Sequence, residues 1–242
     1  MTTAMEDPSN AVHLWRSTPW AWMRPDETES TAIRMVLHDV EGAASAALSH
    51  ASADLFPVVV DGPETTLPDV DDIARHTLAK LDLQPMRLDL NGAHDSTVNL
   101  DLRAAGHVAV GRLHIACKGH AVVHVHLSGD AGWCGIHFTG QVANGSTLSV
   151  VITDELHHES RVVRCDDWRV GRDATFETGT LSVGGFRRKS DLRHHLDATG
   201  GSVRIGLGVH GQESRHDDHH IEIHHHAGHT NSSLVANVAC GG

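Results

Sequence analysis

The chain has 242 residues, of which 31 are acidic and 19 are basic, and its formal net charge is −12 at pH 7. A surface of this sign repels polyanions, so no nucleic acid partner is expected. The first residues, MTTAMEDPSN, lack the basic and apolar regions of a leader peptide, and no run reaches the roughly 20 apolar residues that cross a bilayer. We therefore expect no membrane partner and a cytoplasmic location.

The character of the sequence changes near residue 95, which predicts a mixed N-terminal region, 1–95, and a β-rich region, 96–242. In the first region, acid-rich and proline-containing pieces alternate with short apolar runs. Apolar residues then recur at near-helical intervals from Val70 to Leu81, after a proline and an aspartate. This pattern predicts a short helix over 68–81.

The second region consists of strand-length runs separated by glycine-containing turns: HVAVGRLHIAC, HAVVHVHL, GSTLSVVI, ATFETGTLSV, SVRIGLGV and HHIEIHHH. The turn pairs that begin at Gly119, Gly145, Arg172 and Gly201 recur at nearly equal intervals, with room for a second strand between them. Such a regular period is typical of a solenoid, although pattern alone leaves a sandwich or barrel open.

The four cysteines, Cys117, Cys134, Cys165 and Cys240, are widely separated and form no C-x-x-C pair. This spacing argues against a disulfide framework and a local zinc motif and indicates reduced thiols. Cys117 and Cys165 lie in strand patterns and are expected to be buried, whereas Cys134 and Cys240 could be exposed. Known nucleophile, phosphate-loop, dinucleotide and metalloprotease motifs are absent from the sequence, so we expect no enzyme activity.

Seven of the 23 histidines lie between His216 and His229. Within HHIEIHHH, Ile221 and Ile223 occupy one side of a predicted strand, while histidines and a glutamate occupy the other. Imidazole is a common ligand of zinc and iron, which gives a candidate metal site. Alternate side chains on a strand are roughly 7 Å apart, so two of them need a third ligand from an adjacent turn. The other interpretation is a solvated polar face. The candidate ligands are His216, His220, His224, His225 and His226.

Three segments, in one order along the chain, resemble the SufB/SufD family of iron–sulfur cluster assembly scaffold proteins, with SufD as the closer branch. The first is LWRSTPW, 14–20, and the second is the run that ends in Gly-Arg-Asp-Ala at 171–174 and Gly-Gly at 184–185. The third is the histidine segment, with His216, His225 and Ser232. Members usually continue past an Lys-Gly pair, where this chain has Asn237 and Val238. We therefore expect a chain that lacks the C-terminal part.

The resemblance implies a right-handed parallel β-helix, with aliphatic residues inside, preceded by a smaller mixed α/β region. It also implies a non-catalytic SufD-like scaffold that forms a heterodimer with a SufB-like subunit. In complete homologues a SufC-like ATPase joins them as a SufBCD complex. No cofactor is expected to bind stably, and an Fe–S cluster would be held transiently in complex with SufB. The alternative function is a stand-alone His-rich β-solenoid that binds divalent metal ions.

Overall fold

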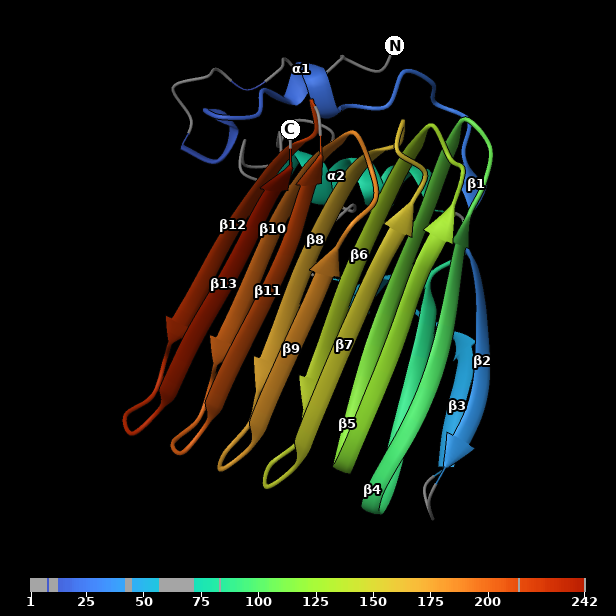
Figure 1. The fold of residues 1–242 in the computed structure, drawn as a ribbon. Helices are drawn as coiled ribbons and strands as arrows, with labels where there is room; N and C mark the ends of the chain where they lie inside the picture. Colours follow the sequence, from blue (N-terminus) through green and yellow to red (C-terminus); the bar gives the residue numbers. More distant parts are fainter. Residues whose placement is uncertain are drawn as a thin grey trace, which may run out of the picture.

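A computed structural model describes residue 8 and residues 13–41, 45–56, 72–82, 84–212 and 214–241. Most of these residues coil into a parallel β-solenoid of about six turns (Figure 1). Strands β4 and β5 bend, and each supplies both strands of its turn; in the later turns, successive strands alternate between two sheets. The strands of the solenoid are β4 (Met86–Ala104), β5 (Val108–Gly129), β6 (Trp133–Val142), β7 (Thr147–Leu156), β8 (Arg161–Val170), β9 (Thr175–Ser182), β10 (Arg187–Leu196), β11 (Ser202–Gln212), β12 (His216–His225) and β13 (Asn231–Gly241). The predicted parallel β-solenoid is confirmed.

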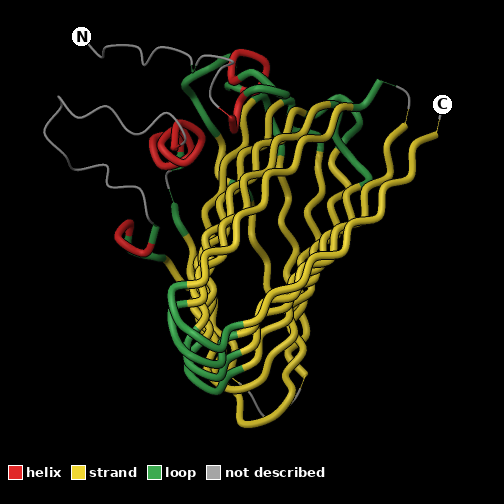
Figure 2. Tube along the Cα trace, turned by 90° about the vertical axis from the view of Figure 1, so that its left-hand side faces the viewer, coloured by secondary structure: helices red, strands yellow, loops and turns green. Residues whose placement is uncertain are grey.

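The two sheets form the two walls of the coil. The covered sheet contains the first halves of β4 and β5 with β6, β8, β10 and β12, and the open sheet contains their second halves with β7, β9, β11 and β13. Figure 2 looks along the stack and shows the described helices outside one of the two walls. The two walls therefore have different surroundings.

The register between turns explains the repeat that the sequence shows. Val108 lies opposite Trp133 near the start of the solenoid, and Ser202 lies opposite Asn231 near its end. Each position on one turn is thus stacked on its counterpart one period later. At the corner of β5, Gly119 has φ +96°, a left-handed conformation that side-chain-bearing residues rarely adopt, so glycine there lets the strand pass from one sheet to the other.

The N-terminal region closes the first turn and covers one sheet. Strands β2 (Arg34–Glu41) and β3 (Ser45–His50) pair antiparallel with β4, and β1 (Thr31–Ala32) pairs parallel with β5. Two short 3-10 helices lie at His13–Trp15 and Ala53–Leu55. The division predicted near residue 95 falls within β4, whose pairing with β5 begins at Met86; the division stays a prediction.

Helix α2 (Ile73–Leu81) confirms the second part of the helix predicted over 68–81; residues 68–71 lie outside the described residues. With α1 (Trp20–Met23) it packs on the outer face of the covered sheet. Leu78 is fully buried there, and the Trp133 indole donates a hydrogen bond to the Met23 carbonyl oxygen. An apolar cluster thus joins the N-terminal region to β5, β6 and β8. Its other members include Trp15, Trp20, Ile73, Val108, Val163 and Cys165.

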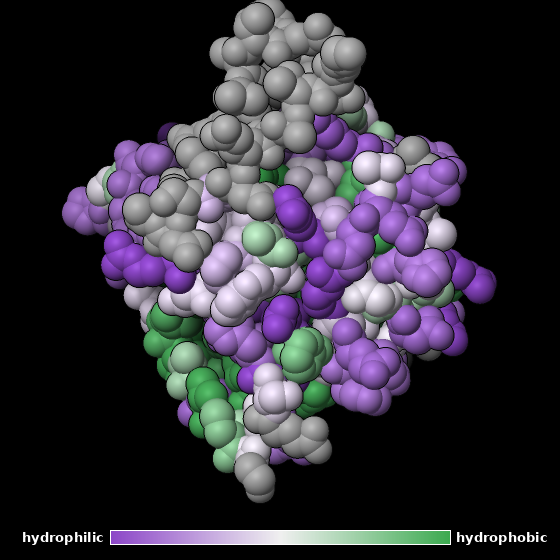
Figure 3. All heavy atoms as spheres, turned by 90° about the horizontal axis from the view of Figure 1, so that it is seen from above, coloured by the Kyte–Doolittle hydropathy of each residue, from purple (hydrophilic) through white to green (hydrophobic). Residues whose placement is uncertain are grey.

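The outer face of the open sheet carries exposed apolar side chains instead. Val151, Leu181 and Val235 are 44%, 48% and 60% exposed, and they project from β7, β9 and β13. Figure 3 shows, from above, a largely hydrophilic face with hydrophobic residues gathered on the left, the side on which β13 lies in Figure 1. The open sheet therefore presents apolar surface to solvent.

The interior is less uniformly aliphatic than the family resemblance implies. The first turns are filled by leucine, valine and isoleucine, but in later turns buried ion pairs lie among the apolar residues. Arg188 Nη1 lies 2.6 Å from Asp154 Oδ2, and Arg164 Nη2 lies 2.7 Å from Asp166 Oδ2. All four residues are at most 3% exposed. The expectation of a purely aliphatic interior is wrong there, and the buried charges are tolerated because each has an opposite partner.

None of the helices in the described part of the chain combines the length and the apolarity needed to cross a bilayer.

Candidate functional site

Histidines gather where β10 and β12 end on the outer face of the covered sheet. The register pairs His195 of β10 with His224 of β12, and even-numbered residues of β12 share their outward direction with odd-numbered residues of β10. His226 follows β12, and its backbone N–H donates to the Leu196 carbonyl oxygen. The solenoid period therefore brings three imidazoles together from two turns.

The three rings are parallel and form a triangle. The ring centroid of His195 is 4.7 Å from that of His224 and 5.4 Å from that of His226, and the latter two are 5.9 Å apart. His195 Nδ1 lies 3.1 Å from His226 Nε2, a hydrogen-bond distance that requires one of these nitrogens to carry a proton. Burial and the neighbouring His224 lower the pKa of His195, which favours its neutral form.

A carboxylate on β12 orients this cluster from one side. Glu222 Oε2 lies 2.9 Å from His224 Nε2, and Glu222 Oε1 lies 2.7 Å from His220 Nε2. The hydrogen bond from His220 is the main cause of the lowered pKa of Glu222. Because an ionised carboxylate only accepts, each histidine donates its Nε2–H to it. The Nδ1 lone pair of His224 is then free to act as a ligand.

The structure brings together two of the five histidines predicted as ligands, His224 and His226. His220 shares their face but pairs with Glu222, and His216 lies at the start of β12, where its Nε2 is 2.8 Å from Thr18 Oγ1. His225 points to the opposite side and contacts Thr230 and Ser232. As the side chains lie, no group of three or more His, Cys, Asp or Glu residues in the described ranges could hold a metal ion. The predicted ligand set stays a prediction.

Sequence reasoning missed His195, although it required a third ligand from an adjacent turn. The signal was present, because a shift by one solenoid period aligns RRKSDLRHHL with HDDHHIEIHH and places His195 on His224. The turn pairs reveal the period of the solenoid but not the register of whole strands.

A second polar cluster lies on the same sheet beneath α2, but it is buried. Arg75, which is 1% exposed, donates from Nε to Asp167 Oδ2 at 2.8 Å and also pairs with Asp191. His137 Nε2 lies 2.6 Å from the same Asp167 oxygen. Burial alone would raise the pKa of Asp167, but the His137 hydrogen bond and the Arg75 charge outweigh it and lower that pKa. The cluster ties α2 to β6, β8 and β10.

The thiols are poorly suited to nucleophilic chemistry or to metal binding. Cys117, Cys134 and Cys165 are buried, and burial raises the pKa of each, to about 11 for Cys117. The expectation that Cys134 could be exposed is wrong, because it points into the core from β6. Thiols with raised pKa values stay protonated at neutral pH. Only Cys240 of the four free cysteines is exposed.

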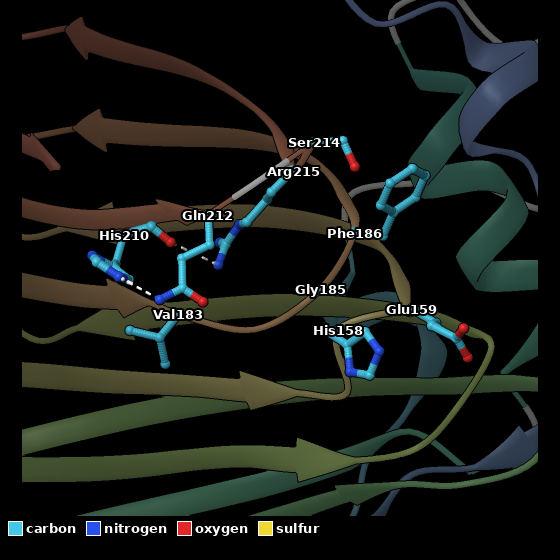
Figure 4. Close-up of a pocket in the computed structure, with 9 residues that line it drawn as sticks. All are labelled: His158, Glu159, Val183, Gly185, Phe186, His210, Gln212, Ser214 and Arg215. Atoms are coloured by element: carbon cyan, nitrogen blue, oxygen red, sulfur yellow. Dashed lines mark hydrogen bonds between the residues drawn. The ribbon is translucent and has the colours of Figure 1, made fainter. Parts of the chain in front are cut away.

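A cavity of about 730 Å³ opens beside the turns that follow β7, β9 and β11 (Figure 4). Arg215 is engaged there by Ser182 and by both carboxylate oxygens of Asp217, and Gln212 contacts His210 at 2.9 Å. Figure 4 shows His158 and Glu159 on the other side of the cavity from His210. The polar side chains do not converge, and we assign the cavity no role.

The family model described as SUF system FeS cluster assembly, SufBD core domain, matches residues 100–242 of the chain. The match covers more than half of the 242 residues, from the second half of β4 through β13. No curated protein matches the chain.

Proposed function

The chain belongs to the SufBD core-domain family of iron–sulfur cluster assembly proteins, and from this premise we propose that it acts as a non-catalytic, SufD-like scaffold subunit in the cytoplasm. The single observation that carries the proposal is the match over residues 100–242. In this function the chain forms a heterodimer with a SufB-like subunit, and in complete homologues a SufC-like ATPase joins the pair. SufD-like identity rests on the N-terminal segment LWRSTPW, 14–20, which lies outside the matched range.

A scaffold role is supported by the state of the thiols. Iron–sulfur clusters are held mainly by cysteine thiolates. Three of the four cysteines are buried with raised pKa values, and the fourth, Cys240, is alone at the surface among them. We propose that the cluster is cargo that forms while the two scaffold subunits are together, and that the chain alone binds none stably.

Pairing with another subunit is supported by the open sheet. Its exposed Val151, Leu181 and Val235 form an apolar surface, and the described turns of the solenoid position them on a rigid wall. Exposed apolar patches commonly mark protein interfaces. We place the contact with the SufB-like subunit on this face.

The test is co-purification with SufB-like and SufC-like proteins from the same source, scored by size-exclusion co-elution and by iron and zinc analysis of each peak. Co-elution with the SufB-like protein is the expected result. Elution of the chain alone would overturn the proposed pairing, and bound divalent metal in that peak would support the stand-alone metal-binding solenoid instead.

A variant pair locates the interface. Leu181→Asp puts a charge among the apolar residues and should weaken co-elution by at least about tenfold, because a buried unpaired charge is costly in an interface. Thr175→Asp puts the same charge on the same strand, β9, and should leave co-elution unchanged. Co-elution of both variants at the level of the unsubstituted chain would place the contact elsewhere.

A further inference from the structure

We propose that His195, His224 and His226 form a binding site for one divalent transition-metal ion of the zinc type, on the outer face of the covered sheet where β10 and β12 end. The inference does not depend on the scaffold function, because the three ligands come from this chain alone. The site combines His224 and His226, which the sequence predicted as ligands, with His195 from a neighbouring turn of the solenoid.

The distance between two of the nitrogens is already close to that of a coordinated pair. Zinc–imidazole bonds of about 2.0–2.1 Å at a tetrahedral angle separate two ligand nitrogens by about 3.3 Å. His195 Nδ1 and His226 Nε2 are 3.1 Å apart. A metal ion can therefore replace the proton shared by these nitrogens with little movement of the backbone.

The third ligand is oriented by a carboxylate, as in many histidine-ligated metal sites. Glu222 accepts the Nε2–H of His224, which leaves Nδ1 of that ring with a lone pair. A carboxylate in this position fixes the tautomer of the ring and makes the ligating nitrogen more basic. Glu222 is thus a positioning residue for the site.

The backbone holds the ligands, while the side chains remain free to adjust. The paired strands β10 and β12 fix the Cα positions of His195 and His224, and His226 is tied to Leu196 through its backbone N–H. The rings lie parallel, so their lone pairs do not yet point at one centre, and no described group of three is arranged around a metal position. His224 is 40% exposed, and rotation of exposed side chains takes picoseconds to nanoseconds.

Two arginines lie near the site, and carboxylates engage both of them. Arg169 of β8 donates from Nη1 to Asp197 Oδ2 at 2.9 Å. Arg193 of β10 donates from Nη1 to Asp72 Oδ1 at 2.8 Å. Glu222 adds a negative charge on β12. An incoming dication therefore meets arginines whose charges are compensated together with a carboxylate beside its ligands, which favours its binding.

The experiment is titration of the purified, metal-free chain with Zn²⁺ by calorimetry, with Co²⁺ as a spectroscopic probe of tetrahedral nitrogen coordination. We expect one equivalent that is lost, or weakened by at least about 100-fold, in His195→Asn and in His224→Asn. Glu222→Gln should weaken the same equivalent about 10-fold to 100-fold. His124→Asn, which removes an exposed histidine from the open sheet, should leave it unchanged.

Circular dichroism and the melting temperature of each metal-free variant show whether the fold persists. Unchanged zinc stoichiometry and affinity in His195→Asn would overturn the site. Loss of the equivalent in His216→Asn but not in His195→Asn would also overturn it, and would favour ligands along β12 alone. Since no second subunit is present, failure of this test leaves the proposed scaffold function untouched.

Discussion

The two walls of the solenoid have the same backbone and opposite surroundings. Over the covered sheet, a charged and an apolar side chain of α2, Arg75 and Leu78, are buried against the outer face of the strands. On the open sheet, Arg204 and Leu181 occupy outward positions in solvent. Strand pairing is equivalent on both walls. A comparison of the two walls therefore measures how much an outer layer contributes to the stability of a β-solenoid. Stability should depend strongly on side chains buried between α2 and the covered sheet, and weakly on outward side chains of the open sheet.

The largest effect is expected from the buried arginine. Arg75→Ala removes the buried cation that Asp167 and Asp191 share and leaves them only His137 and Arg193, respectively. Removal of one partner from a buried ion pair typically costs about 3–5 kcal/mol. The free energy of unfolding should fall by this amount in urea titrations followed by circular dichroism. If the variant does not fold, Arg75→Lys retains the charge and should recover part of the loss.

The matched change on the open sheet is Arg204→Ala. Its ion pair with Glu177 joins side chains that are 65% and 37% exposed, so we expect a loss below about 1 kcal/mol. Comparable losses in Arg75→Ala and Arg204→Ala would mean that the outer layer does not determine the strength of these ion pairs.

Leu78→Ala tests the apolar contact between α2 and the sheet. Leu78 is fully buried, and truncation of a buried leucine typically costs about 2–5 kcal/mol. Thermal unfolding should show a clear drop in melting temperature. Leu181→Ala, from a side chain that is 48% exposed, should change the free energy of unfolding by less than about 0.5 kcal/mol.

The contrast between the two walls also separates the features that could be predicted from the sequence from those that could not. Alternating patterns and the turn period predicted the strands, the parallel solenoid and most of α2, because those features depend on local periodicity. Which wall would be covered could not be predicted, since it depends on contacts such as Arg75 with Asp191, 116 residues apart. The buried pairs of the interior were missed for a related reason: Arg188 is acceptable inside because Asp154 and Asp217, from other strands, lie within ion-pair distance. The three histidines of the proposed metal site are brought together by the register between β10 and β12. The turn pairs alone do not give this register.

A smaller effect is expected from His114, which is buried on the covered sheet beside Arg87 and Asp89 of β4 and bonded to Thr139 of β6. Burial, followed by the Arg87 charge, lowers its pKa to about 4, although Asp89 opposes this. The unfolded chain, with a histidine pKa of about 6.5, therefore binds the proton more tightly than the folded chain. The contribution of neutral His114 to the free energy of unfolding should be fully present above about pH 6.5. The free energy of unfolding should fall by up to about 3 kcal/mol as the pH decreases from about 6.5 to 4.

His114→Gln should make this pH dependence shallower in urea titrations at a series of pH values. His124→Gln, which removes an exposed imidazole from the second half of the same strand, controls for the loss of one histidine. An unchanged slope in His114→Gln would show that the folded chain protonates His114 without cost.

The last expected effect has opposite signs on the two walls. At Gly179 of β9 an added Cβ would meet nothing within 4 Å, so Gly179→Ala should stabilise the open sheet by about 0.5–1 kcal/mol, since glycine loses more backbone entropy on folding. At Gly135 of β6 the same atom would lie 2.3 Å from Leu78 Cδ2 and 2.5 Å from the Trp133 ring. Gly135→Ala must therefore displace α2 or the indole, and overpacking of this kind typically costs about 1–3 kcal/mol. Chemical denaturation of the two variants measures both signs. Destabilisation by Gly179→Ala would mean that the outer face of the open sheet is already in contact with another part of the protein, and the contrast between the two walls would then have to be abandoned.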